Sequence, residues 1–374
     1  MRLVNMKHMS DHYKLALNLY NTQGQILLKA GTQLSEKTIK HIRNLGYQSI
    51  YITDPISTEI MDDYMDPTLR FESLNKIEEA FKAYNYYVKL KEDNTHSGKV
   101  ENAEYLYLNK IKDLADDLIL YLSDKHQIQI QFMDLKRRDD YLLKHSLNVA
   151  IYSILLGFKM NLPKDKIQIL GIGALLSDIG MNNVNGRITL KKDKLSKKDK
   201  SEVMKHPVWG YKFLKENHLI SPMTRAVVLQ HHERLDGSGY PRGLEGDKIL
   251  DLAQIVAIAD TFDALTSDRP YRKALLPKYA LDYITSKTGV IATTDIIKKF
   301  TEIIVPYPNG TIIKLNDDRF AIVDQQNKGY PLRPKIDLIT LVNGKIQKRP
   351  IDLLKENNLT IDNIEYEIEN VIKL

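Results

Sequence analysis

Two stretches of the sequence decide the fold: residues 170–181, LGIGALLSDIGM, and residues 226–241, AVVLQHHERLDGSGYP. In each stretch, apolar side chains recur at helical spacing and lead into residues that can bind a metal, Asp178 in the first and the adjacent His231 and His232 in the second. An unpaired carboxylate in apolar surroundings costs roughly several kcal/mol, so a cation is the obvious compensation. The first hypothesis is therefore a helical domain with a buried metal centre.

Three further residues combine a metal-binding side chain with an apolar helical pattern. His145 lies in a helix that is apolar nearly all round, Asp260 follows the apolar run 255–259, and His206 closes the helix expected after a lysine-rich run, directly before a proline. A lone buried histidine is more often a hydrogen-bonded core residue than a ligand, and aspartates at helix ends can be caps or partners of arginine. Four histidines and two aspartates in such positions favour a metal site over those alternatives.

Length and composition restrict the class of protein. A chain of 374 residues is too long for one ordinary core, so two or three domains are expected. No segment approaches the roughly 18 uninterrupted apolar residues of a membrane span, and the signal-peptide pattern is missing, which predicts a cytoplasmic protein. With 0 cysteines, any divalent metal must be held by His, Asp and Glu, a donor set that suits iron or manganese, with zinc as a further candidate.

The net charge is mildly basic and indicates little about partners. It amounts to +6, with a pI near 9.0, and much of the excess lies in residues 191–200. This run lacks the interleaved aromatic side chains that stack on bases, so a solvated loop and helix start is favoured and no nucleic-acid partner is expected. The same charge could attract a phosphate ligand to a nearby site.

The hydrophobic period predicts a multidomain chain. In residues 1–55, strand-like alternation at Leu15, Leu17 and Leu19, a second strand over 25–28 and a helix capped by Ser35 indicate a small α+β fold. Beyond Pro306 the period changes to two, which is typical of a small all-β domain. The predicted division is an N-terminal α+β domain over 1–55, linker helices over 56–133, an all-α helical bundle over 134–303 and an all-β domain over 304–374.

Motifs in the central region resemble the HD-GYP family, the branch of the HD superfamily that hydrolyses cyclic di-GMP. They are the pair His231 and His232, the run 236–241 (DGSGYP) behind it, and the run 259–272 (ADTFDALTSDRPYR). The resemblance extends roughly from Asp139 to Ala280, and the terminal segments are similar to those that flank this domain in some cytosolic Gram-positive proteins. It implies an HD-type helical bundle, and it makes Gly239, Tyr240 and Pro241 the signature loop.

The resemblance also implies roles for individual residues. Asp178 would be the catalytic aspartate that bridges two metals, of which one is completed by His145, Asp260 and the His of the HD pair, and the other by His206, His231 and His232. Arg269 and Arg272 match positions that hold the phosphates and guanines of the substrate. Some members carry a third-metal carboxylate where this chain has Tyr141.

Two residues depart from the family pattern. Ser177 replaces the His of the HD pair, and Met181 replaces a Lys that stabilises charge on the scissile phosphate. A neutral hydroxyl is a poor ligand beside an imidazole, so one tightly bound metal is expected rather than two. Loss of one electrostatic contact costs about 10² to 10³ in rate by analogy with oxyanion-hole deletions.

Three interpretations of the function follow. The first is a cyclic di-GMP phosphodiesterase weakened by Ser177 and Met181, and the second is a non-catalytic receptor or scaffold that still binds cyclic di-GMP. The third is a different HD phosphohydrolase, for instance on mononucleotides, against which the Gly-Tyr-Pro run argues. The sequence leaves open a homodimer and a protein partner bound through the terminal domains.

Overall fold

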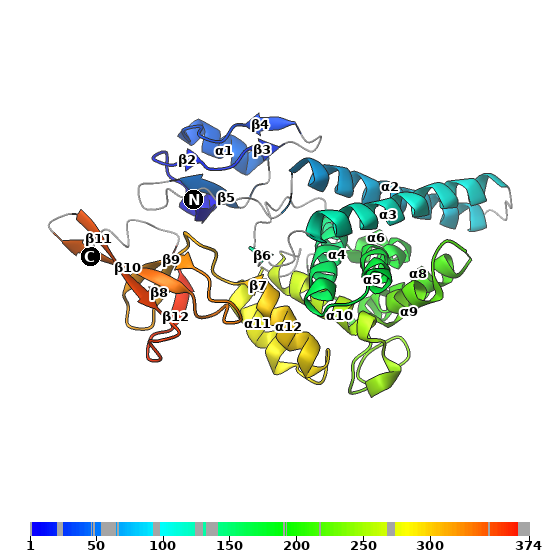
Figure 1. The fold of residues 1–374 in the computed structure, drawn as a ribbon. Coiled ribbons are helices and arrows are strands. Elements are labelled where there is room, and N and C mark those ends of the chain that lie inside the picture. Colours follow the sequence, from blue (N-terminus) through cyan, green and yellow to red (C-terminus); the bar gives the residue numbers. More distant parts are fainter. Residues whose placement is uncertain are drawn as a thin grey trace. The chain divides into compact units, whose positions relative to one another are not determined.

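The computed structural model describes most of the chain. The residues outside the description are 1, 21–24, 46, 48, 54–64, 66, 93–97, 124–129, 132–140, 190, 192, 217, 268–273, 343–344 and 366–374. The chain divides into two compact units, one with residues 69–128 and 140–303, the other with residues 1–68, 129–139 and 304–374. The first unit is helical and the second contains the strands (Figure 1).

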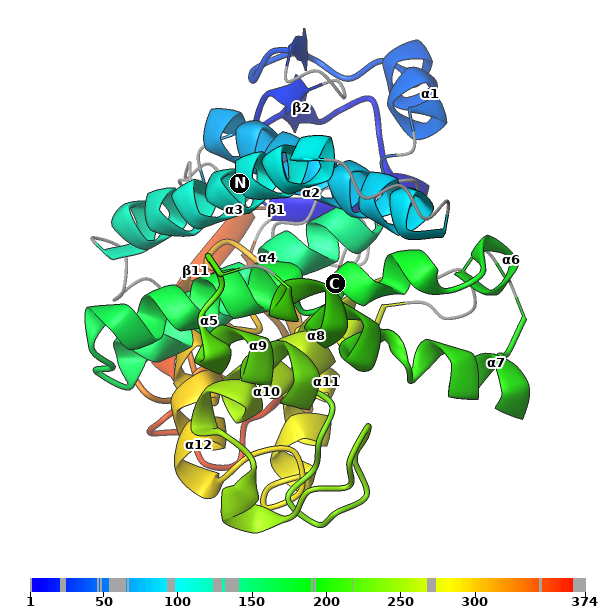
Figure 2. The same ribbon diagram turned by 90° about the vertical axis from the view of Figure 1, so that its right-hand side faces the viewer.

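The helical unit begins with two long helices, α2 (Pro67–Glu92) and α3 (Gly98–Ser123). The helices and 3-10 turns that follow in chain order are α4 (Tyr141–Lys159), α5 (Lys164–Leu176), η3 (Ile179–Asn183), α6 (Gly186–Thr189), α7 (Lys197–Val203), α8 (His206–Lys215), α9 (Pro222–Gln230), η4 (Gly246–Lys248), α10 (Asp251–Thr266), α11 (Pro277–Ser286) and α12 (Thr294–Ile303). Helix α9 contacts α5, α8 and α10, and the four helices lie close together in Figure 2. The predicted all-α central region is confirmed.

Helix α4 forms the centre of this unit, as its apolar surface predicts. Every residue from His145 to Gly157 is buried, and the helix packs against α5, α10, α3 and α12. Among the described residues it is the one helix long and apolar enough to cross a membrane by length and composition alone. Since 72% of that apolar window is buried inside the protein, a core helix accounts for its composition.

Helices α2 and α3 differ from the linker that the sequence predicts, because α3 packs against α4 and α5. Ile111, Leu114 and Leu118 of α3 are all 0% exposed. Tyr84 of α2 donates a hydrogen bond to the Asn183 side chain at 2.8 Å. The two helices therefore complete the bundle instead of only connecting domains.

The N-terminal part of the strand unit has its own apolar core. Ser35 caps α1 (Glu36–Asn44) by accepting a hydrogen bond from the Thr38 amide, as predicted. The single strand expected over residues 15–19 is instead two short strands, since the first pairs with Ser49–Thr53 and the second with Ile26–Leu28. The strands are β1 (Arg2–Asn5), β2 (Lys14–Leu15), β3 (Leu19–Tyr20), β4 (Ile26–Leu28) and β5 (Ser49–Thr53), and one sheet has the order β1-β5-β2.

The C-terminal part is all-β, as the period of two predicts. The strands are β8 (Ile312–Leu315), β9 (Phe320–Gln325), β10 (Lys335–Val342), β11 (Lys345–Asp352) and β12 (Ile361–Ile364). They form one antiparallel sheet with the order β11-β10-β9-β8-β12. A separate parallel pair joins β6 (Ile130–Gln131) to β7 (Ile304–Val305). The predicted Asn343-Gly344 turn lies outside the described residues.

Candidate metal centre

Asp178 is brought to the site by a close approach of two segments. It follows Ser177, the C-cap of α5, and precedes η3. A Cβ added to Gly180 would overlap the carbonyl of His206 and the amide nitrogen of Gly210 in α8. Glycine is therefore required at position 180 for η3 to lie against α8, and this contact places Asp178 next to His206.

The sequence predicted that His206 closes the lysine-rich helix. In the structure it begins the next helix instead. Helix α7 ends at Val203, and α8 starts at His206 with Pro207 in its first turn. Proline favours that position because its missing N–H has no helical partner there and its fixed φ suits the helix. The prediction treated the proline as a terminator of the preceding helix, which is why it was wrong.

Four side chains form a compact group of donors. Asp178, His206, His231 and His232 each offer a ligand atom, and these atoms all lie within 4.8 Å of one another. His206 Nε2 lies 3.2 Å from Asp178 Oδ1 and 3.3 Å from His231 Nε2. The HD-GYP resemblance implies these four residues as the ligands of one metal, and the structure brings them together.

The tautomers of two histidines favour a cation in this group. Nδ1 of His206 lies 2.8 Å from the Val203 carbonyl, and Nδ1 of His231 lies 2.8 Å from the Val228 carbonyl. A carbonyl can only accept, so both Nδ1 atoms donate, and each neutral ring then carries its lone pair on Nε2. Two lone pairs that face each other at 3.3 Å repel unless they share a cation, which can be a metal ion or a proton held between His206, His231 and the Asp178 carboxylate.

The remaining predicted ligands lie beside the group. His145 Nε2 is 3.0 Å from Asp260 Oδ1 and 3.4 Å from Asp178 Oδ2. Asp260 Oδ2 is in turn 3.8 Å from His232 Nδ1. All six predicted ligands therefore converge in the interior of the helical unit, while their role as ligands stays a prediction.

Sequence reasoning missed Asp263, which holds His145 in place. Asp263 is 1% exposed, and its carboxylate accepts hydrogen bonds from His145 Nδ1 at 2.6 Å and from Asn148 Nδ2 at 2.8 Å. A carboxylate on the far nitrogen fixes the ring orientation and directs Nε2 toward the site. The available signal was the spacing, because Asp263 lies three residues after Asp260 and shares its helix face.

Burial and neighbouring charges shift the pKa values of the site. Burial together with His206 lowers the pKa of His231 to about 4, and burial together with His231 lowers that of His232 well below its usual value. Burial would raise the pKa of Asp178, but the hydrogen bond and charge of His206 lower it. Burial would lower the pKa of His145, but Tyr141 and the hydrogen bonds to Asp260 and Asp263 raise it. The lowered pKa values keep His231 and His232 neutral beside the Asp178 carboxylate, and neutral imidazoles with a carboxylate can bind a divalent ion.

Both residues that depart from the HD-GYP pattern lie within three residues of Asp178 in the sequence. Ser177 is 3% exposed, and its Oγ donates to the Ala174 carbonyl at 2.9 Å. Met181 lies in η3, three residues after Asp178, and brings no charge. The position at which the HD-GYP resemblance implies an imidazole is therefore taken by a hydroxyl that already bonds to the backbone.

The signature loop borders the centre, whereas the predicted phosphate-binding arginines cannot be placed. The Tyr240 ring stacks on the His232 ring, with centroids 4.7 Å apart and planes at 29°. Pro241 follows Tyr240 through a cis peptide bond. Arg269 and Arg272 lie outside the described residues, so their assignment to substrate stays a prediction.

The close approach at Gly180 yields a first prediction. Gly180→Ala is expected to destabilise the protein by about 1–3 kcal/mol or more, because the added methyl overlaps backbone atoms of α8. Thermal unfolding measures this loss, and metal affinity should fall with it. Gly186→Ala is the matched control, since nothing lies within 4 Å of a Cβ at Gly186. Equal stability of the two variants would contradict the proposed packing.

Comparison with known proteins agrees with the HD-type resemblance. Residues 131–292 match a family described as the HD domain, and residues 312–370 match a KOW domain associated with the HD domain. A cyclic di-GMP phosphodiesterase from Pseudomonas aeruginosa is 30% identical over 234 residues, which cover 63% of this chain and 56% of that protein.

Two shorter matches fall in the same class of protein. A cyclic di-GMP phosphodiesterase response regulator from Xanthomonas campestris pv. campestris is 38% identical over 133 residues, 35% of each chain. A 3'3'-cGAMP-specific phosphodiesterase from Vibrio cholerae is 36% identical over 140 residues, 37% of this chain and 30% of that protein. The chain thus spans from about a third to just over half the length of these three relatives.

Proposed function

Since residues 131–292 are an HD domain whose relatives hydrolyse cyclic dinucleotides, we propose that the protein is a metal-dependent cyclic di-GMP phosphodiesterase of HD-GYP type. Its rate is reduced by Ser177 and Met181. The observation that carries the proposal is the group of Asp178, His206, His231 and His232, with two Nε2 lone pairs turned toward the same point.

These four residues would hold one divalent ion, with iron or manganese preferred. When bound, the ion supplies positive charge for a phosphate oxygen and lowers the pKa of a coordinated water. The chain's own residues position the ligands: the Val203 and Val228 carbonyls orient His206 and His231, and Asp263 orients His145. Arg269 and Arg272 would hold the phosphates and guanines, as the family resemblance implies.

A second candidate is a receptor or scaffold that binds cyclic di-GMP without cleaving it. The observation that favours it is the Ser177 hydroxyl, which is bonded to the Ala174 carbonyl and leaves His145, Asp260 and a share of Asp178 for the first metal. Without a second ion, one charge that clamps the reacting phosphate is missing.

A cytoplasmic location, a homodimer and a partner of the terminal domains stay predictions.

A substrate panel tests the proposed function against both alternatives. Cyclic di-GMP, 3'3'-cGAMP and a set of mononucleotides are incubated with Mn²⁺-loaded protein, and both binding and product are measured. Slow cleavage of cyclic di-GMP supports the proposal, and binding without product supports the receptor. Cleavage confined to mononucleotides would make the chain a different HD phosphohydrolase.

The incomplete first site predicts the metal content. Purified protein is expected to hold one tightly bound ion per chain after mild chelation, because one half of the centre lacks an imidazole. Elemental analysis of the chelated protein measures it. Two retained ions would show that Ser177, a water or another group replaces the missing ligand.

The two arginines yield a prediction about the ligand. The pair Arg269→Ala and Arg272→Ala is expected to weaken cyclic di-GMP binding about tenfold or more, because guanidinium groups form bidentate, charge-assisted hydrogen bonds with phosphate and guanine edges. Calorimetric titration measures the affinity. Arg187→Ala, an exposed residue of α6, is the control. Unchanged affinity in the double variant would remove these arginines from the site.

A further inference from the structure

Glu233 is a buried carboxylate that lies outside the donor group. It directly follows His231 and His232, yet it is 1% exposed. One carboxylate oxygen accepts a hydrogen bond from the Arg242 amide at 2.8 Å, and the other accepts from the Leu244 amide at 2.9 Å. Both oxygens are thus used to hold the far side of the loop that starts at Glu233.

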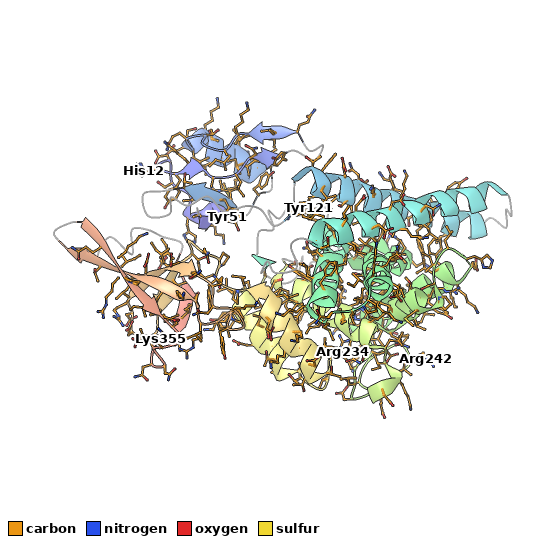
Figure 3. All side chains as sticks on the ribbon, viewed as in Figure 1. His12, Tyr51, Tyr121, Arg234, Arg242 and Lys355 are labelled. Carbon is orange, nitrogen blue, oxygen red and sulfur yellow. The ribbon has the colours of Figure 1, made fainter. Side chains whose placement is uncertain are left out.

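Other contacts close the same loop around Glu233. The Tyr240 amide donates to the His232 carbonyl at 3.1 Å, and the Gly246 amide donates to the Leu235 carbonyl at 3.0 Å. A Cβ on Gly239 would overlap the backbone of Glu233 and the Arg234 amide nitrogen, so this turn lies flush against the start of the loop. Arg234 and Arg242, labelled in Figure 3, belong to the two sides that the carboxylate joins.

The closed loop carries Tyr240 to the partly exposed side of the metal centre, where His232 lies. The side chains of His232, Asp260 and Asp178 are 15%, 14% and 13% exposed, whereas that of His206 is 2% exposed. The Tyr240 ring stacks on His232 and meets His206 edge-on, with centroids 6.5 Å apart. Rotation of the His232 ring away from the other ligands would therefore require Tyr240 to move.

We propose that Glu233 is a positioning residue for the metal centre: by holding the loop closed it keeps Tyr240 against His232 and so slows the loss of the metal. This inference rests on the proposed metal binding. Its chemistry is simple. A carboxylate satisfies two converging backbone N–H groups, and the stacked ring removes the rotational freedom through which a ligand would leave.

The test compares four holoproteins in one experiment. Wild type, Tyr240→Phe, Tyr240→Ala and Glu233→Gln are loaded with Zn²⁺, and release to excess chromogenic chelator is timed by stopped flow. Tyr240→Phe keeps the ring and should release Zn²⁺ at nearly the wild-type rate. Tyr240→Ala should release it roughly tenfold to a hundredfold faster, the size of effect seen when partners of metal ligands are removed.

Glu233→Gln should also accelerate release, because its amide NH₂ meets one of the two N–H donors and leaves that donor unpaired. Thermal unfolding of the metal-free proteins distinguishes a positioning role from a general loss of stability. If Glu233 only positions the loop, Glu233→Gln releases Zn²⁺ faster although its metal-free form is as stable as wild type. If Glu233→Gln does not fold, the comparison of Zn²⁺ release from Tyr240→Phe and Tyr240→Ala still tests the inference.

Equal release from Tyr240→Phe and Tyr240→Ala, or wild-type release from a folded Glu233→Gln, would overturn the inference alone. A wild-type chain that binds no Zn²⁺ would overturn the metal centre itself, and the inference with it. The two failures are therefore distinguishable within the same experiment.

Discussion

Replacing Ser177 by His together with Met181 by Lys is expected to raise hydrolysis of cyclic di-GMP by at least about two orders of magnitude. The first change supplies the imidazole that the half-site of His145 and Asp260 lacks, and the second supplies a cation for the scissile phosphate. One lost electrostatic contact alone costs about 2.7–4 kcal/mol. Initial rates of linear product formation measure the gain.

Each single substitution should recover less than the pair. A lysine has little charge to stabilise without an activated nucleophile, so the two effects should not add. The Ser177→His single variant isolates the metal site, and Met181→Lys isolates the cation. If the double variant holds two metals and stays as slow as wild type, catalytic geometry has been lost elsewhere and the receptor interpretation is the better one.

Asp178→Asn is expected to weaken metal binding by at least about a hundredfold, because loss even of a partner of a metal ligand typically costs 10–100-fold. Asp178 lies 3.2 Å from His206 and 3.4 Å from His145, so its charge serves both halves of the centre. Competition with a chelator of known affinity measures the change.

Asp165→Asn is the matched control for this variant, since Asp165 is an exposed residue in the first turn of the helix that leads to Asp178. Its metal affinity should equal that of wild type. Similar affinities in the two variants would mean that Asp178 is held by histidines for structural reasons only.

Periodicity and motif spacing predicted the broad architecture because they report burial. The apolar surface of α4 and the period of two beyond Pro306 correctly indicated a central helical core and a C-terminal sheet. The convergence of the six candidate ligands was also predicted, because charged or polar residues in apolar helices must point at a partner. The four-residue donor group within them was implied by the family resemblance.

Features that depend on tertiary pairing could not be predicted in the same way. The break between β2 and β3 arises because the two strands pair with different partners. The packing of α3 on α5 was missed because the many polar residues of α3 made its apolar face hard to recognise in the sequence. Asp263 and Glu233 were missed for the same reason, since their roles come from the atoms they meet: His145 in one case and the amides of Arg242 and Leu244 in the other.

The most direct test of the central claim is hydrolysis of cyclic di-GMP with Mn²⁺-loaded protein in excess over the nucleotide, followed by chromatography of the linear product. Under these conditions even a slow phosphodiesterase completes a turnover. The account predicts slow conversion that stops on chelation and is absent in Asp178→Asn. Cyclic di-GMP that binds to the metal-loaded protein and is recovered intact would contradict it.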